Sequence, residues 1–84
     1  MRFSMMRNED AVKKIFGEQI RAIRHKRELS QEALANLCEL DRTYIGGVER
    51  GERNISLINI VKLADAFEVP ASELMQPLTR GCKT

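Results

Sequence analysis

The segment DRTYIGGVERGERN, residues 41–54, carries side chains suited to binding through hydrogen bonds and charge rather than to covalent chemistry. In a helix that advances about 100° per residue, Ile45, Val48 and Glu49 share one side. The opposite side then carries Arg42, Thr43, Gly46, Gly47 and Arg50. The segment therefore predicts a polar face that has two arginines, one hydroxyl and a centre of bare backbone.

The two adjacent glycines need an explanation, because each costs a helix about 1 kcal/mol relative to alanine. Bare backbone lets a helix approach another surface closely, and a deep groove is such a surface. Under this hypothesis Gly46 and Gly47 lie against the binding partner. The alternative is that the glycines relieve crowding against a neighbouring helix. It applies more to Gly47, which lies nearer the core side, than to Gly46.

The remaining reactive residue types are too few for a metal or catalytic site. The chain has two cysteines, Cys38 and Cys82, and one histidine, His25, whereas a structural zinc ion needs about four ligands. We expect a buried thiol at Cys38, a tail thiol at Cys82 and a surface imidazole in RHKRE. Neither a nucleophile–base pair nor paired carboxylates are evident, so the sequence indicates no enzyme, cofactor or metal.

Five helices and no strand are expected to position these residues, which predicts an all-α fold. The expected helices span residues 9–26, 31–38, 42–50, 57–67 and 70–75. Four side chains are expected to be N-caps: Asn8, Ser30, Asp41 and Ser56. Gly51 suits the left-handed residue that ends the third helix. The side chains expected to face inward on the second and fourth helices are Leu34, Leu37, Leu57, Ile60, Leu63, Ala64 and Phe67.

Eighty-four residues with a net charge of +2 correspond to one small domain. We expect a flexible N-terminus over residues 1–8, the helical domain over 9–76 and a tail over 77–84. No apolar run approaches the roughly 18 residues of a membrane span, and MRFSMMRNED lacks a signal-peptide core. A cytoplasmic protein without a membrane partner is therefore expected. Because the net charge is small, an anionic partner must be bound through the placement of positive charges.

The second and third predicted helices have the helix-turn-helix arrangement, in which the second helix of the pair lies in the DNA major groove. The stretch SQEALANLCELDRTYIGGVERGERNISLINIVKLADAFEV resembles the lambda-repressor-like (XRE) helix-turn-helix family. This resemblance covers residues 16–75 and implies that family's five-helix DNA-binding domain. Within it, LDRTYIGGVERGERN most resembles the controller proteins of restriction–modification systems.

The resemblance implies binding of double-stranded DNA through the third helix and its flanks. Arg42 matches an arginine that reads guanine edges, a role that its fork of donors suits. Thr43 matches a residue that contacts bases or backbone, and Gln31 and Tyr44 match residues that contact phosphate. The resemblance implies contacts with the DNA backbone for the residues just after the third helix: Arg50, Arg53 and Asn54. Gly46 departs from the pattern, because several relatives have a serine there that also contacts DNA. We therefore expect a different preferred operator.

Glu49 is expected to point inward among apolar neighbours, where an unpaired carboxylate is costly. In the resembled superfamily the matching glutamate pairs with an arginine of the first helix. Arg24, seven residues before Gln31, occupies that place. The resemblance thus implies a structural Arg24–Glu49 ion pair, and a phosphate contact by Arg24 stays open as the alternative.

The family that this sequence resembles dimerises through the fifth helix and the end of the fourth. The resemblance therefore implies a homodimer on a two-fold symmetric operator, with recognition helices about one DNA turn, roughly 34 Å, apart. We expect Leu74 in the core of the monomer. The residues expected at the dimer interface are Phe67, Val69, Met75 and Leu78.

The leading hypothesis is a sequence-specific DNA-binding transcriptional regulator, a dimeric controller that binds its own promoter region. An antitoxin or prophage-type repressor of the same fold is the alternative. A third hypothesis is a protein-interaction module that does not bind DNA. RNA polymerase is a further candidate partner, although an activating surface has no signature in the sequence. The operator sequence and the sign of regulation are not encoded in any motif of this chain.

Overall fold

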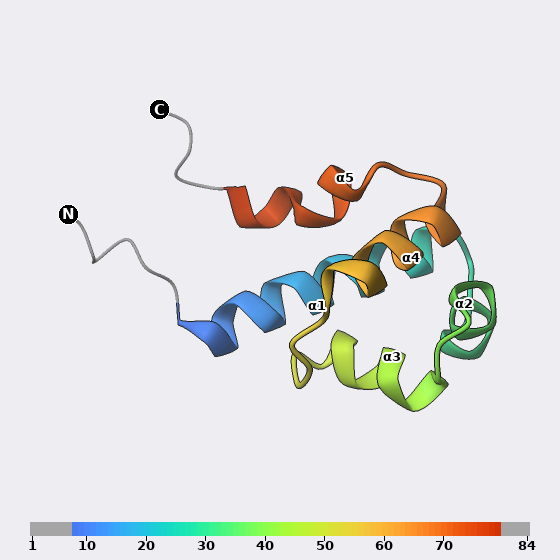
Figure 1. Ribbon diagram of the computed structural model, residues 1–84, viewed down its shortest axis with the longest axis horizontal. Helices are drawn as coiled ribbons and strands as arrows, with labels where there is room; N and C mark the ends of the chain where they lie inside the picture. The colour runs from blue at the N-terminus through green and yellow to red at the C-terminus, as the bar shows by residue number, and fades with distance from the viewer. Residues whose placement is uncertain (1–7, 80–84) are drawn as a thin grey trace.

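The computed structural model describes residues 8–79, and over this range the chain is helical and contains no strand. Its α-helices are α1 (Glu9–Lys26), α2 (Gln31–Cys38), α3 (Arg42–Glu49), α4 (Leu57–Phe67) and α5 (Ala71–Met75). A short 3-10 helix, η2 (Gln76–Thr79), follows directly. The predicted all-α, five-helix fold is confirmed (Figure 1), with α3 ending one residue early at its C-cap Arg50.

Local hydrogen bonds set the helix boundaries where the sequence predicts them. All four predicted N-caps accept a bond from an amide of the first turn, at Asn8, Ser30, Asp41 and Ser56. At Asp41 this bond, from the Thr43 amide, is 2.8 Å long. Gly51 has a φ of +78°, the left-handed conformation expected after α3. Caps of this kind contribute about 1 kcal/mol each, so they fix where α2 and α3 begin.

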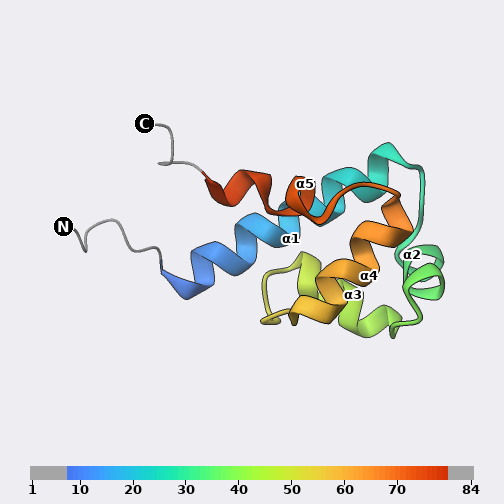
Figure 2. The ribbon, with the colours of Figure 1, turned by 45° about the horizontal axis from the view of Figure 1, so that its top comes forward.

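The helices enclose one core beneath the α2–α3 pair. In both views α5 and η2 lie along α1, and α3 packs on α1 and α2 (Figures 1 and 2). The fully or nearly buried apolar side chains are Phe16, Ile20, Ile23, Leu34, Ala35, Cys38, Ile45, Val48, Leu63, Ala64, Phe67 and Leu74. Two of them, Ile45 and Val48, anchor α3 to this core and thereby orient its other side outward.

Gly17 allows α1 and α3 to meet backbone to backbone. A Cβ atom at Gly17 would lie 2.3 Å from the carbonyl oxygen of Val48 and 2.7 Å from that of Glu49. Both distances are far inside van der Waals contact, and both neighbours are main-chain atoms that cannot rotate away. The depth at which α3 sits on α1 therefore depends on the absence of a side chain at this position.

Two leucines expected to face inward are exposed instead. Leu37 is 58% exposed on α2 and Leu57 is 73% exposed on α4, so these two predictions are wrong. Ile58 and Val61 on α4 are also exposed. Helical periodicity identifies which residues share a side, but not how far along the helix neighbouring elements cover that side. The first half of α4 thus presents an apolar surface that the other described residues leave uncovered.

The residues predicted for dimer contacts fall into different environments. Phe67 is fully buried within the monomer, so its assignment to the interface is wrong, because no part of it reaches the surface. Leu74 is also fully buried, as predicted for a core residue. Val69 and Leu78 are half-buried against the core, whereas Met75 is 36% exposed. Of the residues predicted for the dimer interface, only Met75 is therefore exposed.

Some predictions concern the chain ends. Helical structure continues through η2 to Thr79, inside the tail predicted from residue 77. The remainder of that tail, with Cys82, and residues 1–7 of the predicted N-terminus lie outside the described residues.

Cys38 is a buried thiol in the core, as predicted, and burial raises its pKa to about 11. Its thiolate is therefore scarce near neutral pH.

Candidate nucleic-acid interface

Arg42 and Thr43 occupy the exposed first turn of α3. The three residues 39–41 connect α2 to α3, and the Asp41 cap fixes the start of that turn. The Arg42 guanidinium and the Thr43 hydroxyl make no hydrogen bond or ion pair with the residues that the structure describes. Both side chains are therefore available to an external partner at the N-terminal turn of a helix whose other side is buried in the core.

The centre of this face is not bare backbone, which corrects the prediction for the two glycines. Gly46 and Gly47 are buried. A Cβ at Gly46 would lie 3.2 Å from Nη1 of Arg50 and 3.5 Å from Oε1 of Gln31. A Cβ at Gly47 would lie 3.0 Å from Cγ of Arg53. Long polar side chains cover both glycines, because such side chains fold back over small neighbours.

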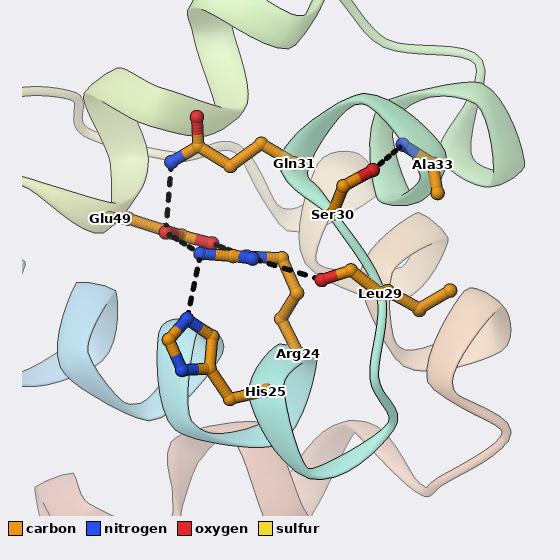
Figure 3. Close-up of polar contacts among 7 residues, drawn as sticks. All are labelled: Arg24, His25, Leu29, Ser30, Gln31, Ala33 and Glu49. Atoms are coloured by element: carbon orange, nitrogen blue, oxygen red, sulfur yellow. Dashed lines mark hydrogen bonds and ion pairs between the residues drawn. The ribbon is translucent and has the colours of Figure 1, made fainter.

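A buried ion pair ties α3 to α1. Arg24 donates from Nε to Oε2 of Glu49 at 2.6 Å and from Nη2 to Oε1 at 3.0 Å. Its Nη1 donates to the Leu29 carbonyl at 2.9 Å, and its Nη2 lies 3.3 Å from Nε2 of His25 (Figure 3). The expected Arg24–Glu49 pair is therefore present. With its nitrogens engaged and the residue 8% exposed, Arg24 is placed for structure and not for phosphate contact.

Gln31 also belongs to this network, which no sequence pattern indicated. Its Nε2 donates to Oε1 of Glu49 at 3.1 Å, as Figure 3 shows. The resemblance placed Gln31 on phosphate, whereas here the side chain links the start of α2 to the end of α3. Its amide still lies beside Gly46 at the outer side of α3. Gln31 therefore connects the buried pair with the exposed face.

Tyr44 and Arg53 support each other beside α3. The Arg53 guanidinium lies over the Tyr44 ring, 5.5 Å from its centroid. The Tyr44 hydroxyl accepts a hydrogen bond from Nδ2 of Asn59 at 3.1 Å. Because that bond uses an oxygen lone pair, the hydroxyl proton remains available to an acceptor such as a phosphate oxygen. Asn54, next to Arg53, is exposed and lines a shallow depression with residues of α1.

Arg50 forms a two-bond pair with Glu52. Arg50 donates from Nε to Oε2 at 3.0 Å and from Nη2 to Oε1 at 3.1 Å, and both side chains are exposed. The hydrogen bond from Arg50 holds the pKa of the Glu52 carboxyl below its usual value. The same bond raises the pKa of Arg50, so both groups are charged at neutral pH. An acidic residue two positions after a predicted DNA-binding arginine was the signal that could have indicated this pair.

The arrangement is suited to recognition and carries no sign of a metal centre. Within residues 8–79, no three potential ligands gather closely enough to hold a metal ion. None of the described helices has the length and apolarity needed to cross a membrane. What the α2–α3 pair does present is a fork of guanidinium donors and a hydroxyl, both suited to the acceptor edges of bases and to phosphates.

A capped helix pair with a buried inner side and an outward polar side is the arrangement of the helix-turn-helix, which is typical of DNA-binding transcription regulators. Residues 20–74 match the helix-turn-helix family, and the chain belongs to it. The control protein C.BamHI of Bacillus amyloliquefaciens is 45% identical over 71 residues, which cover 83% of this chain and 88% of that protein. The control protein C.SmaI of Serratia marcescens is 44% identical over 64 residues, covering 76% of each.

A solved structure of a controller protein is also similar to this chain. The restriction-modification controller protein C.AhdI from Aeromonas hydrophila superposes with a TM-score of 0.75 and 53% sequence identity. The match covers 76% of this chain and 97% of that one. The resemblance to controller proteins, first seen in LDRTYIGGVERGERN, therefore extends over most of the fold.

Proposed function

We propose that this protein is a cytoplasmic controller of a restriction–modification system, which binds a two-fold symmetric DNA operator near its own gene as a homodimer. One observation carries the proposal: the exposed side chains of Arg42 and Thr43, on the capped first turn of α3, are not engaged by any described residue. Its support in sequence is the similarity to control proteins over more than three quarters of the chain.

Arg42 is the residue we assign to base reading. An arginine at the start of a recognition helix can donate two parallel hydrogen bonds to O6 and N7 of a guanine. Tyr44, Arg53 and Asn54 are assigned to the DNA backbone, since the hydroxyl proton of Tyr44 and the cation of Arg53 suit phosphate oxygens. Thr43 is assigned to a base or backbone contact beside Arg42.

The exposed apolar surface of α4 supports the proposed homodimer and favours an interface on the first half of that helix. Leu57, Ile58 and Val61 are 73%, 64% and 42% exposed, and Val61 lies three residues after Ile58 and four after Leu57. Covering such an apolar surface stabilises a small domain. A second copy of the chain, related by two-fold symmetry, can cover it with its own α4. We therefore assign the interface to the first half of α4 together with Met75, in place of Phe67.

Replacing Arg42 with alanine is expected to weaken binding to the preferred duplex by about 1–3 kcal/mol, with little change for random DNA. The preferred duplex is obtained by selection from a random pool with the wild-type protein. Fluorescence anisotropy then measures the affinity for this duplex and for a scrambled one. Arg21→Ala, which removes an exposed arginine of α1, is the matched control. An equal loss on both duplexes would assign Arg42 to phosphate instead.

Replacing Ile58 with glutamate is expected to convert the dimer to a monomer, because the charge would be buried without a partner. Light scattering coupled to size exclusion measures the molecular mass at matched concentrations. Leu37→Glu makes the same change at an exposed leucine of α2 and is expected to leave the mass unchanged. A dimer that persists in Ile58→Glu would place the interface elsewhere.

A further inference from the structure

Arg50 supplies a guanidinium at the point where α3 lacks a side chain. Arg42, Gly46 and Arg50 follow one another at intervals of four residues along one side of the helix and its C-cap. Helical side chains lean toward the N-terminus and cover the preceding turn. Arg50 does so, with Nη1 3.2 Å from the place of a Cβ on Gly46. The absence of that Cβ makes room for the guanidinium.

Glu52 orients this guanidinium. Its carboxylate accepts hydrogen bonds from Nε and Nη2 of Arg50. Nη1 is left without a hydrogen bond to the described residues, and it is the nitrogen that lies beside Gly46. Because two parallel bonds favour one plane of the guanidinium, the pair with Glu52 directs Nη1 toward Gly46.

The pairing also changes which ligand suits Arg50. A phosphate contact gains mainly from an uncompensated positive charge, which releases counterions from DNA. Glu52 compensates the charge of Arg50 and adds a negative charge beside the helix. What the pair retains is a directed N–H donor, and a directed donor recognises an acceptor on a base edge.

We infer that Glu52 is a positioning residue that holds Arg50 over Gly46, so that Arg50 acts as a second base-reading group of α3. The inference rests on the proposed function and departs from the phosphate contact that the resemblance implies for Arg50. Arg42 and Arg50 would then discriminate at different base pairs of each half-site.

The test measures discrimination rather than affinity alone. Wild type, Glu52→Gln and Gly46→Ala are titrated against the duplex selected by wild type and against a scrambled duplex, at two salt concentrations. Duplexes that carry single base-pair substitutions then locate where discrimination is lost. Glu18→Gln, an exposed residue of α1, makes the same change in charge without touching Arg50. Circular dichroism shows that each variant is folded.

The ratio of the two affinities in Glu52→Gln is expected to fall about tenfold, at one base-pair position that is distinct from the position affected by Arg42→Ala. Gly46→Ala is expected to lose discrimination at the same position as Glu52→Gln, because its methyl group displaces Nη1. The double variant is expected to lose little more than either single variant, since the two changes act on one group. Glu18→Gln keeps the wild-type ratio.

Other outcomes overturn the inference. If Glu52→Gln binds both duplexes more tightly by the same factor, Glu52 contributes only charge. If both affinities fall equally, Arg50 is a phosphate ligand. Either outcome leaves the proposed function intact, because wild type still prefers its selected duplex. If wild type has no such preference, the proposed function fails and the inference fails with it.

Discussion

Replacing Glu49 with alanine is expected to lower the free energy of unfolding by about 3–5 kcal/mol, the cost of leaving a buried charge without its partner. Arg24 is only 8% exposed and gives two hydrogen bonds to this carboxylate. Gln31 loses an acceptor as well. Urea unfolding followed by circular dichroism, for wild type and variant, measures the difference. Such a loss is a large part of the stability of a small domain.

Two further variants separate this cost from a general effect of charge. The double variant Arg24→Met, Glu49→Leu removes both charges and is expected to recover much of the lost stability. Glu52→Ala removes the acidic partner of an exposed pair and is expected to leave the unfolding midpoint unchanged. A loss below about 1 kcal/mol for Glu49→Ala would mean that water reaches the guanidinium of Arg24.

Replacing Gly17 with alanine is expected to destabilise the protein by at least about 2 kcal/mol, although alanine favours a helix. The added methyl group would meet the carbonyl oxygens of Val48 and Glu49 at 2.3 and 2.7 Å. Main-chain atoms can yield only if α1 and α3 move apart, which loosens the packing of Ile45 and Val48. The same unfolding experiment measures the effect, and binding to the selected duplex should weaken as α3 shifts.

Gly46→Ala is the matched control within α3. Its methyl group would meet the far end of the Arg50 side chain at 3.2 Å, and that side chain can move. The helix then gains the ordinary preference for alanine, about 1 kcal/mol. If Gly17→Ala were stabilised to the same extent, the contact between α1 and α3 would be too soft to set the position of α3.

The sequence predicted the features of the fold that depend on neighbouring residues. Ser30 and Asp41 begin α2 and α3 because their side chains bond to amides two or three positions ahead, so a short stretch of chain suffices. Gly17 was not predicted, because its role exists only where two helices cross. Leu57 was misplaced for a similar reason, since its exposure depends on what covers the first turn of α4.

In the candidate site, too, the features that depend on local spacing were predicted and those that depend on distant contacts were not. Arg42 and Thr43 could be assigned to the outer side of α3 from helical spacing alone, and both are exposed. The Arg24–Glu49 pair came from a family resemblance and not from spacing, because it joins residues 25 positions apart. The covering of Gly46 by Arg50 was missed, since a helical projection places Cα atoms and ignores the reach of long side chains.

The division of α3 into two sets of residues has a consequence for engineering. Ile45, Val48 and Glu49 attach the helix to the rest of the protein, whereas the exposed side chains of Arg42 and Thr43 make no hydrogen bond or ion pair with the described residues. Variation at the second set therefore leaves the packing of the first set untouched. Under the proposed function, a combinatorial library restricted to residues 42 and 43 can be screened for altered DNA preferences without changing any core residue. If Arg42 and Thr43 read bases as proposed, binding preference can be changed without altering the residues that hold α3 in the core.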